Sequence, residues 1–255
     1  MKYKHLLVDE NHQGMITITL NNPEQLNAYT RVMLVEFGKV LDKISRMRDI
    51  KAVVITGSGR GFCAGQSLQE ELPPEKAVEY GLGIHYKVIH GLINCRVPVI
   101  AAVNGIAAGA GVSIALACDF IVMSRQASFS MAFSRLGLVP DLGATYLLPT
   151  RIGRSRALYA MLSNETIDAD TALAWGLAVK LTEPDELYPE VEKLAKKIAV
   201  MPGEVATLTK KMVDKSGKQP FCDQFQEELQ INAELVQCDF FEKAIQQFSH
   251  KMNNS

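Results

Sequence analysis

Apolar residues alternate with threonine over residues 15–20 (MITITL), a pattern typical of a half-buried β-strand. A second run over residues 5–10 (HLLVDE) also favours a strand. After the loop NNPEQLNAYT, apolar residues recur at steps of three and four, which predicts an amphipathic helix with Thr30 as its N-cap. The apolar stripe of this helix consists of Met33, Leu34, Phe37, Val40, Leu41, Ile44 and Met47.

The middle of the chain alternates between short apolar strands and helices. The pattern predicts buried strands at KAVVITGSGRG and VPVIAAVNG, and further strands at DFIVMS and ASFS. Between the first two strands it predicts a helix of roughly 20 residues that starts near Glu75. The segment AAGAGVSIALACD has no polar face, so the helix it forms should be buried centrally.

The remainder of the chain is predicted to be mainly helical. Helical periodicity covers residues 153–162, 168–175, 185–199, 203–215 and, in pieces, 221–249, and only LAVKLT interrupts it as a strand. This order favours an α/β or α+β core with a helical C-terminal extension. The extension is amphipathic and rich in charge, which suits contacts between subunits.

Composition excludes several classes of protein. The chain has 255 residues, 47% of them hydrophobic, and a formal net charge of −1, so it shows neither the basic excess of a nucleic-acid-binding protein nor an acidic tail. The five cysteines are scattered without CxxC spacing, which indicates reduced thiols, with Cys118 as a small core residue. We find no signal-peptide pattern and no apolar run of about 18 residues, so we expect a cytoplasmic protein that does not partner a membrane.

The glycine-rich turn VVITGSGRGFCAG admits a nucleotide-binding interpretation. Gly59, Gly61 and Ala64 match a loose dinucleotide fingerprint after a strand. Pro73 and Pro74 would, however, cut short the helix that should hold a pyrophosphate, and no acidic residue follows at the expected distance. The fingerprint is therefore a weak match.

A second interpretation uses the backbone N–H groups of two turns. FCAGQSL and NGIAAGAGVS each leave a strand, and the second opens a buried helix. If both turns face one cleft, their free N–H groups can hold a developing oxyanion. The alternative is that the small residues only allow close packing of the segments. Local chemistry leaves these two possibilities open.

In addition, the sequence resembles the enoyl-CoA hydratase/isomerase, or crotonase, superfamily over residues 5–251. The resemblance rests on LNNPEQLNA, TGSGRGFCAGQSL, VPVIAAVNGIAAGAG, LGLVPDLGAT and WGLAVKL, in the order and spacing of the family. Among members, GFCAGQ, MAFSRLGLVPD and LLP resemble the ring-epoxide isomerases of phenylacetate breakdown. The resemblance implies an α/β fold with a crotonase-type ββα spiral core over residues 1–195. It also implies a C-terminal helical region over residues 196–255 that covers CoA and builds a homotrimer or a dimer of trimers.

The resemblance further implies the substrate and the residues that contact it. The substrate would be an acyl-CoA thioester, with no metal or redox cofactor, and the backbone N–H groups of Gln66 and Ala110 would form the oxyanion hole. The positions that correspond to CoA and substrate contacts are Gln25, Leu26, Ala28, Ala64, Leu68, Phe248 and Lys251. Without the resemblance, Phe248 would be interpreted as helix packing and Lys251 as a solvated charge.

The chain departs from the family at its acidic positions. Hydratases of the family carry two glutamates where this chain has Ser113 and Phe133, and many members have aspartate where it has Ser67. Water addition needs a positioned acid and base, so the two replacements argue against simple hydration. Asp141 stands where several isomerases and a dehalogenase of the family place a working carboxylate. Its local sequence equally suits a residue that caps a helix.

These observations give three hypotheses of function. The first is an isomerase in which Asp141 moves a proton, either shifting a 3-enoyl double bond to the 2-position or rearranging the ring epoxide of an aryl-acyl-CoA. The second is an enoyl-CoA hydratase. The third, from a different class, is a catalytically inert oligomer that binds acyl-CoA.

Overall fold

A computed structural model describes residues 3–11, 14–70, 74–201 and 204–253, of which the side chains of residues 74 and 247–253 are not described. The chain divides into two compact units, Met1–Ala199 and Val200–Ser255. Each unit is described by itself below.

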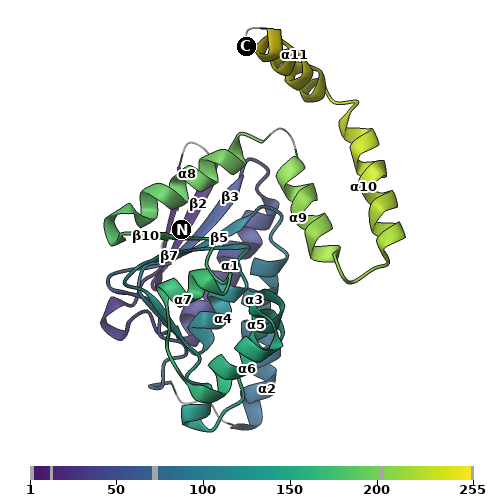
Figure 1. The fold of residues 1–255 in the computed structure, drawn as a ribbon. Coiled ribbons are helices and arrows are strands. Elements are labelled where there is room, and N and C mark those ends of the chain that lie inside the picture. The colour runs from purple at the N-terminus through teal and green to yellow at the C-terminus, as the bar shows by residue number, and fades with distance from the viewer. Residues whose placement is uncertain (1–2, 12–13, 71–73, 202–203, 254–255) are drawn as a thin grey trace. The chain divides into compact units, whose positions relative to one another are not determined.

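Within the described residues, the strands of the first unit form two sheets (Figure 1). The six-stranded sheet has the order β1 (Leu6–Glu10), β2 (Met15–Leu20), β3 (Ala52–Gly57), β5 (Val99–Val103), β7 (Phe120–Ser124) and β10 (Lys180–Thr182). The four-stranded sheet has the order β4 (Gly61–Cys63), β6 (Ile106–Ala108), β8 (Ser128–Ser130) and β9 (Ile167–Asp168). Pairing is parallel except between β1 and β2 and between β8 and β9.

Each turn of the chain adds one strand to both sheets and then a helix. The strand pairs β3–β4, β5–β6 and β7–β8 are followed, respectively, by α2 (Ala77–Tyr80) with α3 (Tyr86–Ile93), by α4 (Ala110–Leu116) and by α5 (Ala144–Ile152). The predicted ββα spiral is therefore confirmed. Since β4, β6 and β8 run parallel, their carboxyl ends meet at one edge. That edge brings together residues 64–66, 109–110 and 131–133.

The first helix forms as the hydrophobic pattern predicts. In α1 (Arg31–Arg46), the Thr30 hydroxyl accepts a 3.2 Å hydrogen bond from the N–H of Met33, as expected of an N-cap. The residues of the predicted stripe are buried from Met33 to Ile44, and Met47 packs partly buried against the same core.

Strand β2 is buried more completely than its alternating sequence predicts. Even Thr17 is only 7% exposed, because α8 (Leu187–Ala199) lies across one face of the six-stranded sheet (Figure 1). The hydroxyls of Thr17 and Tyr188, on α8, lie 3.4 Å apart. The prediction of a half-buried strand was wrong because the sequence of β2 contains no information about α8, the helix that covers its second face.

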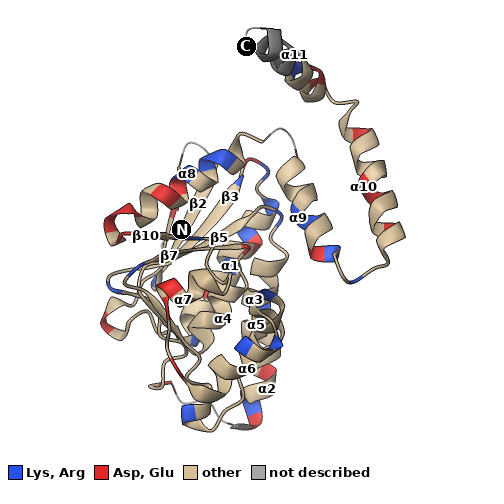
Figure 2. Cartoon of the chain, in the orientation of Figure 1, with Lys and Arg blue, Asp and Glu red and all other residues tan. Residues whose placement is uncertain are grey.

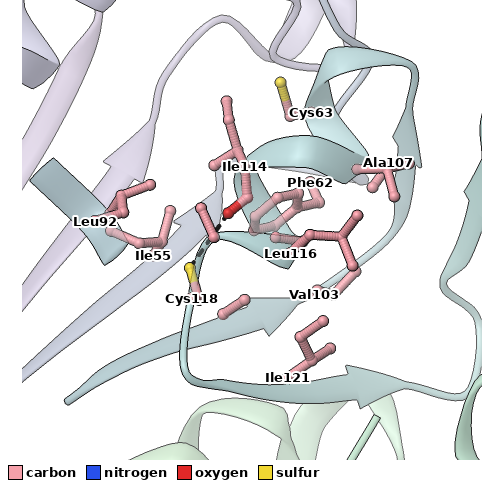
Figure 3. Packing of buried hydrophobic residues seen from close by; sticks show 14 of the residues in the cluster. Ile55, Phe62, Cys63, Leu92, Val103, Ala107, Ile114, Leu116, Cys118 and Ile121 are labelled. Atoms are coloured by element: carbon pink, nitrogen blue, oxygen red, sulfur yellow. Dashed lines mark hydrogen bonds between the residues drawn. The ribbon is translucent and has the colours of Figure 1, made fainter. Parts of the chain in front are cut away.

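Helix α4 is the central helix of the first unit, as its lack of a polar face predicts. All of its residues are buried, and it carries no charge (Figure 2). Cys118, just after it, is 1% exposed and donates its S–H to the carbonyl of Ile114 at 3.4 Å (Figure 3). At the same end, Arg151 donates to the carbonyls of Leu116 and Cys118. These contacts satisfy carbonyl groups that a helix end leaves without partners.

Other elements differ from the sequence prediction. The helix from residue 77 to 93 contains a π-helical segment over Gly81–His85. Helix α5 was expected only under the alternative in which Asp141 caps a helix, whereas its N-cap is Gly143, which has no capping side chain, and Pro149 lies within it. Gly59 and Gly61 lead into strand β4 and not into a helix, so the dinucleotide interpretation is wrong. Helices α6 (Arg154–Ser163) and α7 (Ala169–Ala174) follow the prediction.

The second unit consists of α9 (Val205–Lys215), α10 (Phe221–Leu235) and α11 (Asp239–Asn253). An apolar hollow lies between α9 and α10, lined by Leu208, Met212, Phe221, Ile231 and Leu235 among others. Across the described parts of the chain, we find no helix whose length and apolar character together would let it cross a membrane.

Candidate active site

Two glycine turns touch each other at the carboxyl edge of the small sheet. Gly65 follows β4 and Gly109 follows β6, and both have left-handed backbone angles, with φ of +93° and +51°. A Cβ atom placed on Gly65 would lie 2.9 Å from the carbonyl oxygen of Ala108 and 3.5 Å from the backbone nitrogen of Ala110. Glycine at position 65 therefore allows the two turns to approach closely.

The hydrogen bonds around these turns leave two N–H groups uncommitted. Tyr29 and Gln66 form a parallel bridge in which the Tyr29 N–H donates to Gly65 at 2.8 Å and the Ser67 N–H donates to Tyr29 at 2.9 Å. This pattern leaves the N–H of Gln66 itself outside the bridge. Ala110 is the first residue of α4, so its N–H has no acceptor within the helix. Among the residues that the structure describes, neither N–H group has a hydrogen-bond acceptor.

The structure therefore brings the predicted oxyanion donors of Gln66 and Ala110 into neighbouring turns. Ala110 does not need to be glycine, because its backbone is helical and its φ is not positive. Two adjacent N–H groups can hold one oxygen that gains negative charge during a reaction. This role of the two residues stays a prediction.

The loop over residues 22–28 packs against the first turn. The Ala64 N–H donates to the carbonyl of Leu26 at 2.9 Å, and the Asn22 amide donates to the carbonyl of Ala28 at 3.0 Å. The Ser67 hydroxyl donates to the side chain of Gln25 at 3.3 Å.

Leu68, next to this turn, is 81% exposed. Gln25, Leu26, Ala28, Ala64 and Leu68 thus lie in one region, as expected of a common binding surface. Their contacts with CoA stay predictions. Phe248 and Lys251 fall in α11, but their side chains lie outside the described residues.

Asn27 fixes this loop, and the sequence analysis missed it. Its side chain is fully buried and donates to the carbonyls of Ser58 at 2.9 Å and Gly61 at 2.7 Å. It also accepts from the N–H of Asn22 at 2.9 Å. A signal was available in the sequence, because asparagine tolerates the left-handed backbone that this residue adopts, with φ of 59°.

Asp141 lies in the loop that precedes α5. Its backbone carbonyl accepts a 3.0 Å hydrogen bond from the hydroxyl of Ser113 and another of 3.0 Å from the N–H of Ala144. The N-cap of α5 is Gly143, and among the described residues no side chain caps this end of the helix. The alternative interpretation of Asp141 as a helix cap is therefore wrong.

The backbone after Asp141 is held in an uncommon conformation. Leu142 and Gly143 both have positive φ, 49° and 80°. A left-handed residue that is not glycine costs about 1 kcal/mol or more, and such residues persist where the surrounding structure determines them. The hydrogen bonds from Ser113 and Ala144 to the carbonyl of Asp141 help to hold the backbone in this conformation.

Burial raises the pKa of the Asp141 carboxyl. Of two apolar residues that precede Asp141 in the chain, Phe133 is 7% exposed, whereas Leu138 is 57% exposed. The Phe133 ring also reaches the second turn, because its Cζ would lie 3.9 Å from a Cβ on Gly109. A carboxylate with a raised pKa is a stronger base when ionised, which suits proton transfer at carbon.

Tyr29 is a second residue of this site that the sequence analysis missed. Its side chain is 1% exposed, and its hydroxyl has no hydrogen-bond partner among the described residues. Burial first, and then the charge of Asp141, raise its pKa well above the ordinary value. No local pattern distinguishes this tyrosine, because its position depends on pairing with Gln66, which is distant in sequence.

His85 contacts the ring of Tyr29. The two ring centroids are 5.8 Å apart at an interplanar angle of 64°, and burial lowers the pKa of His85. The two rings line a small hollow together with Arg31, Gln66, Glu70, Tyr80 and Ile84. This hollow adjoins the backbone of the first predicted oxyanion donor.

Cys63 is a potential nucleophile at the end of β4, next to the turn at Gly65, but its side chain is fully buried. Burial raises the pKa of its thiol to about 12, so the thiol stays protonated and is a poor nucleophile. Among the residues described, no group of three or more histidine, cysteine or acidic residues is arranged to hold a metal ion.

Comparison with known proteins identifies similar chains. The family model for enoyl-CoA hydratase/isomerase matches residues 10–255. The chain is 38% identical over 195 residues to 1,2-epoxyphenylacetyl-CoA isomerase of Escherichia coli, covering 74% of each protein. It is 34% identical to a probable enoyl-CoA hydratase of Rhodobacter capsulatus, covering 97% of this chain and 96% of that protein. The crystal structure of a putative enoyl-CoA hydratase/isomerase from Mycobacterium abscessus superposes with a TM-score of 0.92 at 29% identity, covering 96% of both chains.

Proposed function

This chain belongs to the enoyl-CoA hydratase/isomerase family, and we propose that within this family it is an acyl-CoA isomerase. The family acts on CoA thioesters, and the names of similar proteins include both isomerase and hydratase. The choice between these two activities depends on which acidic groups the site offers.

The observation that carries the proposal is the partly buried carboxylate of Asp141. The positions of the two hydratase glutamates hold Ser113 and Phe133, both buried, and neither can act as an acid or a base at neutral pH. Glu70 is another acid beside the first turn, but it accepts from the N–H of Arg31 at 2.8 Å and faces its guanidinium. One available carboxylate suffices for an isomerase, because the same group can remove and return a proton.

The proposed reaction proceeds through an enolate. The Asp141 carboxylate takes a proton from C2 of a 3-enoyl-CoA, and the electron pair of that C–H bond forms the C1–C2 double bond of the enolate. The N–H groups of Gln66 and Ala110 stabilise the charge on the thioester oxygen. The protonated Asp141 then returns its proton to C4, and the double bond moves to the position between C2 and C3. Charge and hydrogen count are conserved.

Rearrangement of a ring epoxide on an aryl-acyl-CoA is the second form of isomerase activity that we consider. It is supported by the similarity to the epoxyphenylacetyl-CoA isomerase. In this form the same two amides would hold the thioester oxygen while the C–C bond bridged by the epoxide oxygen breaks. The electron pair of that bond forms a new ring double bond and gives an oxepin, in which both C–O bonds remain. In both forms we propose that no metal or redox cofactor takes part and that CoA is part of the substrate. We also propose a homotrimer or a dimer of trimers as the assembly.

A panel of acyl-CoA substrates with product analysis tests the proposal. We expect 3-enoyl-CoA or an epoxidised aryl-acyl-CoA to be converted to its isomer, and crotonyl-CoA to keep its conjugated thioester absorbance. Loss of that absorbance with formation of 3-hydroxyacyl-CoA would instead identify a hydratase. Thermal stabilisation by these esters without turnover of any of them would identify an inert acyl-CoA-binding protein.

A further inference from the structure

The hydroxyl of Tyr29 is a buried polar group without a partner. The side chain is 1% exposed, and its oxygen makes no hydrogen bond within the part of the chain that the structure describes. Buried hydroxyls nearly always have a partner, because leaving one unpaired costs folding free energy. An orphaned donor beside a site is available to an acceptor that arrives with the substrate.

The position of Tyr29 places this donor beside the predicted reacting groups. The backbone of Tyr29 is hydrogen-bonded to both chain neighbours of Gln66. Its N–H donates to Gly65 and its carbonyl accepts from the N–H of Ser67. Its phenol lies close enough to Asp141 for the charge of that carboxylate to raise its pKa. Tyr29 thus lies beside Gln66, the residue of one predicted oxyanion donor, and the two residues line the same hollow.

Two charged groups around the same hollow, Glu70 and Arg31, pair with each other. Glu70 accepts from the backbone of Arg31 at 2.8 Å, and the Arg31 guanidinium lies 5.2 Å from the centroid of the Tyr80 ring. Burial keeps His85 in its neutral form near neutral pH. Tyr29 is likewise held as a neutral phenol, which can donate one hydrogen bond.

We propose that Tyr29 is a specificity-determining residue whose O–H donates to an oxygen on the acyl group of the substrate. The thioester oxygen is assigned to the amides of Gln66 and Ala110, so the acceptor is a second oxygen. Preferred substrates are therefore acyl-CoAs that carry an epoxide, ether, hydroxyl or carbonyl oxygen on the acyl chain or ring. Plain hydrocarbon acyl groups leave the donor unpaired and are disfavoured. The inference rests on the proposed function, because it takes an acyl-CoA thioester as the ligand.

The test compares matched substrates in the wild type and in Tyr29→Phe, which removes only the hydroxyl oxygen. The substrates are two isomerisable acyl-CoAs of equal size, one with an oxygen and one with a methylene at the same position. We expect the wild type to prefer the oxygenated ester by about tenfold or more in kcat/KM. We expect Tyr29→Phe to lose this preference through a fall on the oxygenated ester alone. Tyr80→Phe, which alters another tyrosine of the same hollow, is the control and should keep it.

Two results would overturn the inference. One is a wild type that does not distinguish the two esters. The other is an equal loss on both esters in Tyr29→Phe, which would mean that the hydroxyl serves Asp141 and not the substrate.

Failure of the proposed function would appear differently, as absence of turnover of either ester by the wild type. In that case thermal stabilisation by the two esters decides the inference. A larger stabilisation by the oxygenated ester that disappears in Tyr29→Phe supports it, and equal stabilisation overturns it.

Discussion

The hydroxyl of Ser113 donates a hydrogen bond of 3.0 Å to the backbone carbonyl of Asp141. Ser113 lies on α4, the helix that Ala110 begins, so the bond joins the second oxyanion turn to the loop of the proposed base. Position 113 corresponds to a glutamate of the family's hydratases. In this chain it holds a serine, whose hydroxyl helps to fix the loop of Asp141 in place. The exchange of a reacting group for a positioning group is consistent with a one-carboxylate mechanism.

Ser113→Ala tests this positioning. Removing a buried hydroxyl that bonds a carbonyl costs about 1 kcal/mol of unfolding free energy. We expect kcat to fall several-fold with little change in KM, because the loop of Asp141 loses one of its two fixed contacts. Steady-state kinetics and chemical denaturation measure the two effects.

Ser134→Ala is the matched control, since the Ser134 hydroxyl also donates to a carbonyl, that of Met161, at 3.3 Å. Because Ser134 is exposed whereas Ser113 is buried, this variant should lose less stability and retain kcat. Equal kinetic losses in both variants would show that Ser113 acts only through general stability.

Gly65→Ala tests the contact between the two turns. Gly153 serves as the control, because its φ of +79° is also left-handed but a Cβ there meets nothing within 4 Å. Gly153→Ala should cost about 1–2 kcal/mol of stability, from its backbone conformation alone. Gly65→Ala adds a clash with the carbonyl of Ala108, which raises the cost by a further 1–3 kcal/mol or so.

The activities of these two variants should differ more than their stabilities. A shift of the Gly65 turn displaces the adjoining N–H of Gln66, so we expect kcat to fall at least tenfold in Gly65→Ala and to stay near wild type in Gly153→Ala. Wild-type kinetics in a folded Gly65→Ala protein would argue against an oxyanion hole at this turn.

The pH dependence of activity follows from the raised pKa of Asp141. The base must be ionised, so kcat/KM should fall on the acid side with a midpoint above the ordinary aspartate value of about 3.9. A pH–rate profile on the isomerised substrate measures this midpoint. A midpoint at or below the ordinary aspartate value would contradict the claim that burial raises the pKa of Asp141.

The same pKa shift has a stability consequence of defined sign. Because the folded protein binds the Asp141 proton more tightly than the unfolded chain, the ionised carboxylate disfavours folding at neutral pH. We therefore expect Asp141→Asn to be as stable as wild type or more stable at pH 7. The difference should shrink as the pH falls through the folded pKa. Denaturation at a series of pH values measures it, and a marked loss of stability at neutral pH would contradict it.

Much of the fold could be predicted from local sequence because local chemistry determines it. Thr30 caps α1, and the stripe from Met33 to Ile44 is buried, as its spacing requires. The start of helix α5 could not be predicted, since Gly143 provides no capping side chain and the sequence favoured Asp141 as the cap. The burial of Thr17 on β2 involves Tyr188 of α8, which lies far away in the sequence.

The candidate site was predictable only where the family resemblance supplied it. Gln66, Ala110 and Asp141 came from that resemblance, and the structure brings the turns of Gln66 and Ala110 into contact. Tyr29 carried no local signal, because its significance lies in a bridge to Gln66 and in its proximity to Asp141. A local sequence pattern contains little information about contacts between residues that are far apart in the chain.

The most direct test of the account is the conversion of 3-enoyl-CoA to conjugated 2-enoyl-CoA by Asp141→Asn. The control is Asp170→Asn, which alters an exposed aspartate paired with Arg125 at 3.0 Å. We predict that Asp141→Asn loses about 10²- to 10⁴-fold in kcat while CoA esters still stabilise it against heat, and that Asp170→Asn keeps wild-type kinetics. An Asp141→Asn enzyme that isomerises the substrate within a few-fold of the wild-type rate would contradict the central claim.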